Sequence, residues 1–550
     1  MNLTISLNKK VFRSILNRIA GINPVKAVAI IAIILAIAST AYSFAHDYII
    51  VYGDAESHLD IAKRIVNSLT PGFAQMGGIW LPVPHLLMLP FIWSDYLWRT
   101  GLAGSIVSGI CYVISTIYIY KSTILLTKNK LASFAAAMVF ATNPNILYMQ
   151  STPMTELTLI VFFILSTYYF MIYIKDHRNT LALMLASIYA FIASLSRYDG
   201  WFLVAFEGLF VIASHFSIPD VIKSIKEHRY VRLWNKFQEA QGRAIFYGTV
   251  ACFGILLWMI WDYLILGDPF YFTNSQFSAR TQQQNWQARG ELPAAHNVGV
   301  AFIYYFMTSL SNAGVLIFFV GVAGLIVYVM DKEQRNKFFI ATMLLVPFIF
   351  NVFTLYAGQS VIFIPHVTPV SFEWRLFNVR YGIMMIPSIA ILIGFLVHKR
   401  HWIGRMLIAF FIVAQFGLFA IGYSSVISFA DGVQGLSSAK RPDAERWIIK
   451  HYDHGLVLLD DYARTLSIVR SGMPMQNVIY VGNKPYWDES LYAPEKYARW
   501  IITQQNDSVW NHVIEDPAVK ARLYKYFEKV YTSPEILIFR RKDNVKIDSK

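Results

Sequence analysis

Two carboxylates stand two positions apart in the segment Asp54-Ala55-Glu56, directly after the first long apolar run of the chain. A carboxylate at the mouth of a helix can accept a proton from a reacting group. The competing interpretation is structural, because Asp is a good N-cap, Glu in the first turn suits the helix dipole, and Ser57 with Asp60 has capping-box spacing. Local sequence leaves both roles open for the acidic pair.

Two arginines, Arg375 and Arg380, lie in a polar stretch that ends as Arg380-Tyr381-Gly382 at the start of a late apolar run. An arginine at this depth is costly unless it meets an anion, and its planar fork suits a phosphate. The alternative is a pair of interfacial arginines that extend toward the lipid headgroups. The stretch therefore predicts either an anion site or a membrane anchor.

Further candidates lie at the ends of other apolar runs. Glu156 begins one run, and Arg197 with Asp199 occupies a tight turn between two others, where the two charges can pair with each other or join a site. His58 is four residues from Asp54 and can share a helix face with it. We interpret His58 as a hydrogen-bonding group, because two such residues are too few for a metal site.

Two outer segments are rich in aromatic residues. The stretch from Gln75 to His85 combines Gly, Pro and Trp80, and loops of this length in a compact protein are usually functional. The stretch from Tyr271 to His296 is rich in Gln, Asn and aromatic residues, which suit either sugar recognition or a polar surface loop.

The composition shows what must position these residues. Of 550 residues, 56% are hydrophobic and only 15% are charged, with a formal net charge of +14. A soluble chain needs roughly a quarter charged residues, so this one must be buried largely in lipid. A soluble enzyme, a disordered chain and a nucleic-acid-binding domain are disfavoured, and no nucleic acid is expected as a partner. Two cysteines, Cys111 and Cys252, cannot form a disulfide framework.

The apolar runs predict a mainly α, polytopic membrane protein with about eleven spans. We place them at 25–44, 98–120, 131–150, 156–174, 181–195, 201–217, 244–266, 313–330, 338–357, 379–397 and 403–424. The stretch 298–310 is either a further crossing or a re-entrant helix, so the number of spans can differ by one. Lys and Arg gather in alternate connections, which predicts a cytoplasmic amino end and puts 47–97, 268–297 and 358–378 outside.

Residues 428–550 change character and predict a small water-exposed α/β domain on the outer side, after a membrane domain at 1–427. A helix is expected to open at 442–445. Strands are expected at 456–459, 478–481 and 536–539, and helices at 494–503 and 518–530.

Three of these motifs together resemble the C-type glycosyltransferase superfamily (GT-C). They are the acidic pair after the first span, the Pro82-Val83-Pro84-His85 element before the second, and Arg380-Tyr381-Gly382 opening a late span. The polyprenyl-phosphate-sugar-dependent branch is the most similar, with protein O-mannosyltransferases, lipid A aminoarabinose transferases and oligosaccharyltransferases. The Pro82 element departs from that branch's proline pair in residue order. The resemblance covers essentially the whole chain.

The resemblance implies an inverting transfer of a hexose or pentose from a dolichyl or undecaprenyl phosphate to a protein, lipid or glycan acceptor. Asp54 is then the base and Glu56 orients the acceptor or shares the proton, while Arg380 first and Arg375 second bind the donor phosphate. Possible substrate-binding residues are His58, His85, Glu156, Arg197 and Trp80. No cofactor is expected, although Mg or Mn held by Asp54 and Glu56 stays possible, since some relatives are metal-dependent.

The resemblance implies that the chain is an integral protein of a prokaryotic plasma membrane, surrounded by membrane lipids. Its site and its C-terminal domain are then extracytoplasmic. The alternative function is a transporter or flippase of lipid-linked sugars, which would place ionisable residues near the bilayer centre and often shows repeated halves. A non-catalytic scaffold is a third reading and predicts no consequence from neutralising Asp54.

Overall fold

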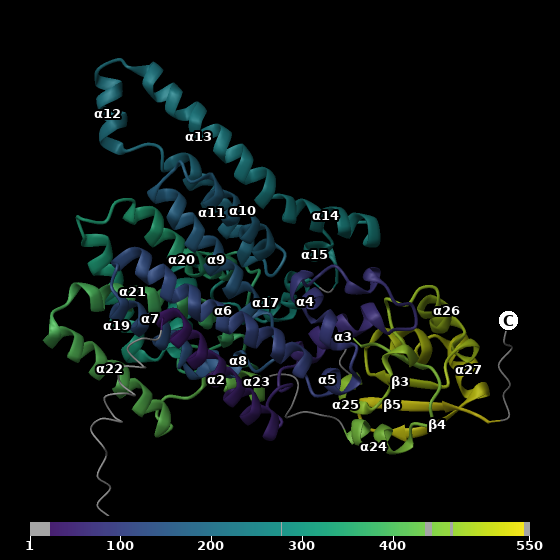
Figure 1. Cartoon of the computed structure of the whole chain (residues 1–550). Coiled ribbons are helices and arrows are strands. Elements are labelled where there is room, and N and C mark those ends of the chain that lie inside the picture. Colours follow the sequence, from purple (N-terminus) through teal and green to yellow (C-terminus); the bar gives the residue numbers. More distant parts are fainter. Residues whose placement is uncertain (1–22, 277, 435–442, 462–465, 544–550) are drawn as a thin grey trace, which may run out of the picture.

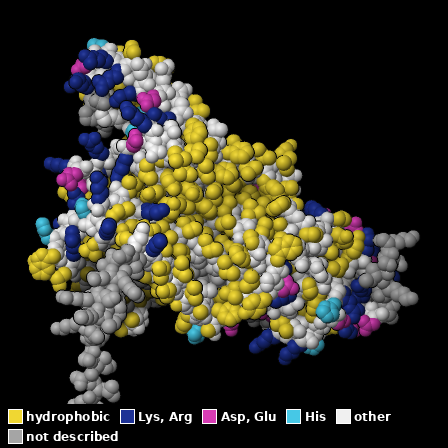
Figure 2. Space-filling model, in the orientation of Figure 1, with side chains coloured by type: hydrophobic (Ala, Val, Ile, Leu, Met, Phe, Trp, Pro, Cys, Tyr) yellow, Lys and Arg dark blue, Asp and Glu magenta, His cyan; other side chains and the backbone are white. Residues whose placement is uncertain are grey.

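The chain folds as a helical bundle with a small mixed sheet domain at one end (Figure 1). The computed structural model describes residues 23–276, 278–434, 443–461 and 466–543. Apolar side chains cover much of the outer surface of the bundle in Figure 2, as expected where lipid rather than water is the solvent.

The helices of the bundle follow the predicted apolar runs. In chain order they are α2 (Pro24–Ala45), α3 (Gly53–Val66), η1 (Phe73–Met76), α4 (Val83–Ile92), α5 (Asp95–Arg99), α6 (Leu102–Thr127), α7 (Lys130–Ala141), α8 (Pro144–Met149), α9 (Glu156–Lys175), α10 (Thr180–Ser194), α11 (Asp199–Ala213), α12 (Ile218–Lys226), α13 (Tyr230–Ala251), α14 (Phe253–Leu266), α15 (Tyr271–Asn274), α16 (Ala279–Gln282), α17 (Gln284–Ala288), α18 (Val298–Ala313), α19 (Val315–Met330), α20 (Lys337–Tyr356), η2 (Val379–Met385), α21 (Ile386–Lys399), α22 (Trp402–Ala420) and α23 (Ile427–Gln434).

Every predicted span contains a helix, although not all are long. Among the residues that the structure describes, seven helices are long and apolar enough to cross a membrane: α2, α6, α9, the Tyr230–Leu266 helix of α13 and α14, α20, the Val379–Lys399 helix of η2 and α21, and α22. An eighth is counted if α18 and α19, bent by 113° at their junction, form one broken span. The helices α7 and α10 are apolar but shorter. The polytopic helical architecture is therefore confirmed.

The break between α18 and α19 has a local cause at Gly314. Its φ of 87° lies in a region that L side chains rarely adopt. A Cβ at this position would also lie 2.5 Å from Gln415, whose side-chain oxygen accepts a hydrogen bond from the Leu316 amide at 2.9 Å. A glycine therefore permits the turn, and Gln415 of α22 satisfies one of the amides that the break exposes.

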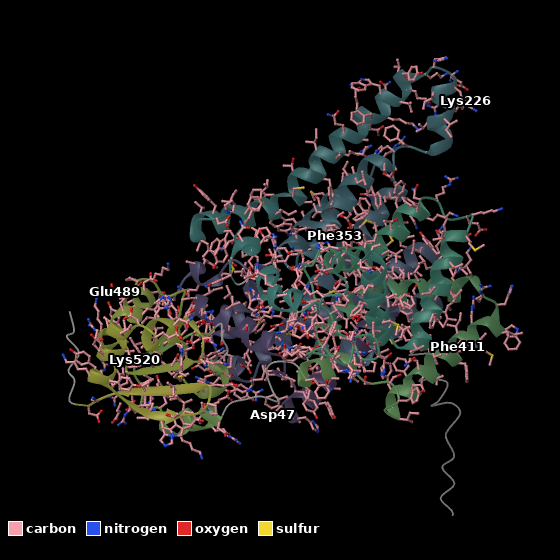
Figure 3. The ribbon with its side chains drawn as sticks, turned by 180° about the vertical axis from the view of Figure 1, so that it is seen from behind. Asp47, Lys226, Phe353, Phe411, Glu489 and Lys520 are labelled. Carbon is pink, nitrogen blue, oxygen red and sulfur yellow. The ribbon has the colours of Figure 1, made fainter. Side chains whose placement is uncertain are left out.

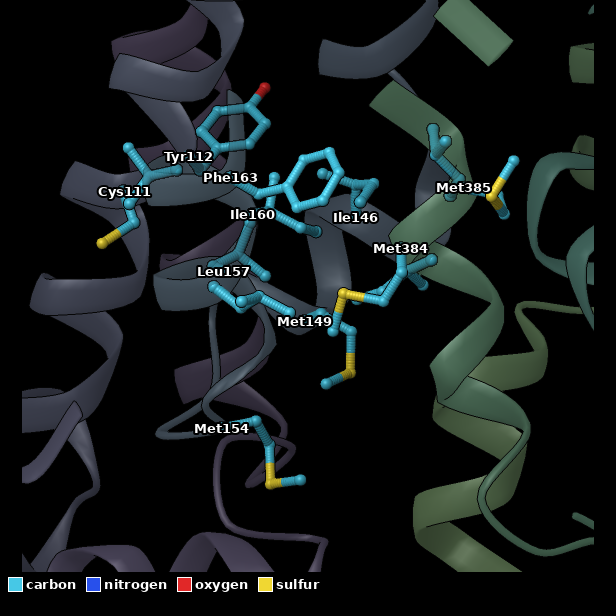
Figure 4. Close-up of a cluster of buried hydrophobic side chains, with 14 of the residues drawn as sticks. Cys111, Tyr112, Ile146, Met149, Met154, Leu157, Ile160, Phe163, Met384 and Met385 are labelled. Atoms are coloured by element: carbon cyan, nitrogen blue, oxygen red, sulfur yellow. The ribbon is translucent and has the colours of Figure 1, made fainter. Parts of the chain in front are cut away.

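The centre of the bundle packs α6, α8 and α9 against η2. Figure 4 shows this cluster, in which Leu157 and Ile160 of α9 lie among side chains such as Tyr112, Met149 and Met384. Leu157 directly follows Glu156, and Met384 lies on η2 together with Arg380. The apolar cluster therefore fixes the two elements that carry those charged side chains.

The C-terminal domain is built on a five-stranded sheet of order β2-β1-β3-β5-β4. Its strands are β1 (Val457–Leu459), β2 (Val478–Ile479), β3 (Trp500–Gln504), β4 (Phe527–Thr532) and β5 (Ile536–Arg541). The helical elements are α24 (Asp443–His451), α25 (Ile468–Ser471), η3 (Met475–Asn477), α26 (Tyr486–Tyr492), η4 (Pro494–Lys496), η5 (Trp510–Ile514) and α27 (Pro517–Tyr526). β1 pairs in parallel with β2 and β3, whereas β5 is antiparallel to β3 and β4.

One sequence prediction for this domain is wrong, and a second is wrong only at its end. The helix expected at 494–503 is a single 3-10 turn followed by β3, because Trp500, Ile501 and Ile502 are buried at the centre of the sheet. The helix expected at 518–530 ends at Tyr526 and continues as β4. Aromatic and β-branched residues favour strands where they pack on both faces, which local periodicity does not reveal. The helix expected at 442–445 begins at Asp443, and Pro442 lies outside the described residues.

The C-terminal domain docks on α3 and α5. Arg64 of α3 pairs with Asp461, and its guanidinium lies 4.0 Å from the ring centre of Tyr480. Arg99 of α5 donates hydrogen bonds to backbone carbonyls of the domain at Val469, Gly472 and Met473. The domain is thus attached at the same end of the bundle as the acidic motif.

Candidate functional site

Asp54 lies in the first turn of α3 and does not cap it. The N-cap position is Tyr52, without a side-chain capping bond, and the Ser57 hydroxyl donates to the Gly53 carbonyl at 3.2 Å. Oδ2 of Asp54 instead accepts a hydrogen bond from Nη2 of Arg380 at 2.6 Å. The capping interpretation of Asp54 is therefore wrong, and its carboxylate belongs to a charged cluster.

Arg380 is the centre of this cluster and is buried. Its Nε donates to Oε1 of Glu156 at 3.1 Å, and Nη1 lies 3.8 Å from Oδ2 of Asp431. The guanidinium carbon also lies 4.9 Å from the ring centre of Tyr52 and 5.1 Å from that of Tyr381. Hydrogen bonds to carboxylates thus use Nε and Nη2, while Nη1 is beyond hydrogen-bond distance of Asp431.

The 3-10 helix η2 places Arg380 through a close backbone approach. A Cβ on Gly382 would lie 2.4 Å from the Thr308 carbonyl oxygen of α18. The Asn312 amide donates to the carbonyls of Thr308 at 2.9 Å and Val379 at 2.7 Å. The Arg-Tyr-Gly motif therefore needs its glycine for contact with α18, and that contact fixes where Arg380 emerges.

Glu156 joins two arginines at the start of α9. Its Oε1 accepts from Arg380 at 3.1 Å and from Nη1 of Arg197 at 3.2 Å, and its side chain is fully buried. Arg197 also donates to Thr155 at 3.1 Å and lies 3.4 Å from Asp199. Arg197 therefore both pairs with Asp199 and joins the site. A buried carboxylate is stable only when paired, which explains the two cations around Glu156.

Asp431 is a member of the cluster that sequence reasoning missed. It lies on α23, which packs against α8 and η2 although it falls within the segment 428–550 assigned to the water-exposed domain. Its Oδ2 accepts from the Arg380 backbone amide and from the Tyr52 hydroxyl, each at 3.3 Å. Burial raises the pKa of Asp431 to about 6 against the lowering effect of Arg380. No local motif marks this aspartate.

Glu56 points away from Asp54. Two positions on a helix are separated by about 200° around its axis, so the two carboxylates leave α3 on different sides. Oε1 of Glu56 lies 3.4 Å from Nε of Arg470, which comes from α25 of the C-terminal domain. Arg470 also donates to the Ile50 carbonyl at 3.0 Å. The acidic pair is thus divided between the bundle and the C-terminal domain, and sequence reasoning did not identify Arg470.

His58, His85 and Trp80 form a group beside the cluster. Nδ1 of His58 and Nε2 of His85 are 3.0 Å apart, and the ring centres of His58 and Trp80 are 4.8 Å apart. Burial lowers the pKa of His58 to about 4, and it also lowers the pKa of His85. The two imidazoles are therefore neutral near pH 7, and one of them donates the hydrogen bond that the other accepts.

Arg375 does not join the cluster. Its side chain is exposed in the connection 358–378, and within the described part of the chain it forms no ion pair with Asp54, Glu156 or Asp431. The neighbouring segment is tied to this connection, because Arg289 pairs with Glu373 at 2.6 Å. Arg380 is thus the arginine that the structure brings to the acidic motif.

The carboxylates of the acidic motif do not fit a shared metal site. Asp54 turns to Arg380 and Glu56 turns to Arg470. Among the residues that the structure describes, no group of three or more His, Cys, Asp or Glu side chains is arranged to hold a metal ion.

The chain is similar to known proteins in one part of its sequence and in its fold. A family model described as Dolichyl-phosphate-mannose-protein mannosyltransferase matches residues 98–233. No curated protein matches the chain. The crystal structure of ArnT from Cupriavidus metallidurans bound to undecaprenyl phosphate is similar at a TM-score of 0.52 and 10% identity, over 94% of this chain and 98% of that one.

An oligosaccharyltransferase from Archaeoglobus fulgidus, in complex with Zn and sulfate, aligns at a TM-score of 0.48 and 13% identity, over 94% of this chain and 73% of that one. The chain is thus similar to a protein mannosyltransferase family over residues 98–233, and its fold is similar to that of ArnT.

Proposed function

We propose that this protein is an inverting glycosyltransferase that moves a sugar from a polyprenyl phosphate to an acceptor at the extracytoplasmic membrane face. The observation that carries the proposal is the contact of 2.6 Å between Asp54 and the buried Arg380. It puts a candidate base directly beside a candidate phosphate-binding cation. The undecaprenyl phosphate in the ArnT structure supports a lipid phosphate as the donor class.

The reaction needs few groups. An acceptor hydroxyl that attacks the anomeric carbon loses its proton to the Asp54 carboxylate, and the bond from that carbon to the phosphate oxygen breaks. The leaving lipid phosphate is already a stable anion, so no general acid is required to protonate it. Arg380 stabilises its charge. Because the reaction is a single displacement, the anomeric configuration inverts.

Arg380 is oriented for this task from its buried side. Glu156 holds Nε, and the Asp431 carboxylate holds the backbone amide of the same residue. The Nη1 edge, 3.8 Å from Asp431, is the part of the fork that makes no hydrogen bond to these carboxylates. A phosphate accepts hydrogen bonds from Nη1 and Nη2, and at Nη2 it competes with Asp54 for the guanidinium. Donor binding therefore releases Asp54 toward the acceptor.

The proposed orientation puts this site outside the cell. The connections rich in Lys and Arg lie at the helix ends away from the C-terminal domain, which suits a cytoplasmic face. The acceptor then approaches from the side where Glu56 meets Arg470 of the C-terminal domain. Glu56 orients the acceptor at this edge, and the hydroxyl of the acceptor meets Asp54.

Donor turnover by the full-length protein in lipid tests the proposal. A panel of undecaprenyl and dolichyl phosphate sugars is compared between the native chain, Asp54→Asn and Glu56→Gln. We expect Asp54→Asn to lower turnover by about 100-fold to 10,000-fold, the usual contribution of a general base. The matched control is Asp488→Asn, which neutralises an exposed carboxylate of the C-terminal domain and should leave turnover unchanged.

The outcome also separates the competing functions. A transporter of lipid-linked sugars would move the donor across vesicles without releasing sugar from its phosphate. Absence of turnover by the native chain with every donor, or native turnover by Asp54→Asn, would contradict the proposed function.

A further inference from the structure

A second surface of the molecule is built for binding and is not used by the proposed site. The hairpin formed by α12 and α13 projects from the bundle, and α13 continues through α14 as one helix of 37 residues (Figure 1). Lys226 lies near the tip of this hairpin in Figure 3, whereas Glu489 and Lys520 mark the C-terminal domain at the opposite end. The hairpin is therefore remote from Asp54 and Arg380.

Both helices of the hairpin expose apolar side chains. Val231 of α13 is 73% exposed, and Tyr230 and Trp234 are each more than half exposed. Ile222 and Ile225 of α12 are exposed as well. Exposed Trp, Tyr, Val and Ile side chains in one hairpin are unfavourable in water, so this surface requires an apolar partner.

An open apolar groove lies within the hairpin. Its volume is about 490 Å³, and its lining includes Phe216, Leu233, Trp234 and Phe237. Positions 230, 233, 234 and 237 recur at helical spacing and form one face of α13. The groove is thus a property of an amphipathic helix rather than a gap between loops.

The rest of the hairpin surface is basic. Five cationic residues lie between positions 223 and 236, namely Lys223, Lys226, Arg229, Arg232 and Lys236. Glu227 is the one acidic residue in that range, and it lies 3.2 Å from Arg229 and 3.9 Å from Lys223. The hairpin therefore presents a net positive charge beside its apolar groove.

The position of the hairpin identifies the partner. Figure 2 shows Lys and Arg side chains on the hairpin and along the edge of the bundle away from the C-terminal domain. The polar part of α13 leads without a break into the apolar part that ends at Leu266. A helix that enters the bilayer a few turns later keeps its first turns close to the lipid headgroups.

We propose that the α12–α13 hairpin docks on anionic phospholipid at the membrane face opposite the C-terminal domain. Its aromatic and aliphatic side chains enter the boundary between headgroups and acyl chains, and its lysines and arginines bind the anionic headgroups. This inference does not rest on the proposed sugar transfer. It predicts a contact that depends on the charge of the lipid.

A fluorophore at Val231 tests the contact in the full-length protein. Val231→Cys is labelled with a nitrobenzoxadiazole dye in a chain that also carries Cys252→Ser, since Cys252 is exposed and Cys111 is buried. The protein is placed in nanodiscs of phosphatidylcholine alone or with added phosphatidylglycerol. Quenching by doxyl-labelled lipid and a blue shift of the emission report entry of position 231 into the bilayer. We expect both signals only in the anionic discs.

Charge reversal separates headgroup binding from simple burial. With Lys223, Lys226, Arg232 and Lys236 changed to Glu, quenching in anionic discs should fall to less than roughly one tenth of the native value, since each basic residue contributes to surface binding. The control reverses the same number of charges on the C-terminal domain, at Lys484, Lys520, Lys525 and Lys529, and should quench as the native chain does. Elution volume and helicity verify that each variant is folded.

Two results overturn the proposal. Equal quenching in neutral and anionic discs means that the groove inserts without recognising lipid charge. No quenching in either lipid means that the surface faces water, another protein or a second copy of the chain.

Discussion

Replacing Asp54 by Asn should have opposite effects on phosphate binding and on turnover. In the resting structure the Asp54 carboxylate occupies Nη2 of Arg380 at 2.6 Å, so a lipid phosphate must compete with it. Asn is similar in shape but carries no charge, which weakens the competition and removes the base in one change. A variant that loses turnover therefore gains affinity for polyprenyl phosphate.

The size of the gain follows from the contact that is lost. A hydrogen bond to a charged group contributes about 1.5 to 3 kcal/mol, and each 1.4 kcal/mol is tenfold in affinity. Part of the contact persists with Asn, whose amide oxygen still accepts a weaker bond. We therefore expect undecaprenyl phosphate to bind about tenfold more tightly to Asp54→Asn, while turnover falls by about 100-fold or more.

Equilibrium binding of undecaprenyl phosphate to the protein in nanodiscs measures the first quantity, and single-turnover sugar transfer measures the second. Glu56→Gln is the matched control, because it neutralises a carboxylate two residues away that faces Arg470 instead of Arg380. This control should leave phosphate affinity near the native value. Weaker or unchanged binding by Asp54→Asn would refute the competition between Asp54 and phosphate for Arg380.

Three further predictions concern Arg380, Arg470 and Asp60. Arg380→Lys keeps the charge but not the fork, and the loss of one charged hydrogen bond should lower kcat/KM for the donor by about tenfold to 100-fold, whereas Arg375→Lys should stay within about twofold of the native rate. Arg470→Ala should raise KM for the acceptor more than it lowers kcat, and it should have little further effect in a Glu56→Gln background, as a double-mutant cycle of initial rates will measure. Burial raises the pKa of Asp60 to about 7 from 3.8, so its charged form destabilises the fold and stability falls as pH rises between about 4 and 7. Asp60→Asn should flatten that pH dependence and raise the thermal unfolding midpoint at pH 8 relative to the native chain. An unchanged pH dependence of stability in this variant would contradict the role of Asp60.

The residues of the site that sequence could predict are charged residues at the ends of membrane-spanning runs. Asp54, Glu156 and Arg380 each stand where an apolar run begins or ends, and a charge at such a place needs a partner. Their position at span ends also predicts that they share one face of the membrane. The actual pairing among them depends on which spans are neighbours, and span composition does not encode that.

The parts that sequence could not predict lie after the last span. Asp431 and Arg470 sit in a stretch whose mixed polarity indicates only exposure to water, yet one closes the cluster around Arg380 and the other pairs with Glu56. The helix expected at 494–503 failed for a related reason, because the burial of Trp500 on the sheet is a tertiary effect. The missed residues and the wrong helix therefore have one cause, since both depend on contacts between residues far apart in the sequence.

Burial distinguishes Asp54, the proposed base, from the other two carboxylates around Arg380. The side chains of Glu156 and Asp431 are 0% and 2% exposed, and each is held by Arg380 or its backbone, whereas the side chain of Asp54, which binds Nη2 of the same guanidinium, is 27% exposed. A buried carboxylate that loses its cation is left uncompensated, so the inner two cannot leave Arg380 during a reaction. In the proposed reaction Asp54 can exchange Arg380 for a substrate, because its side chain is partly exposed. The proposed roles follow this difference in exposure, with orientation of Arg380 for the two inner carboxylates and proton transfer for Asp54.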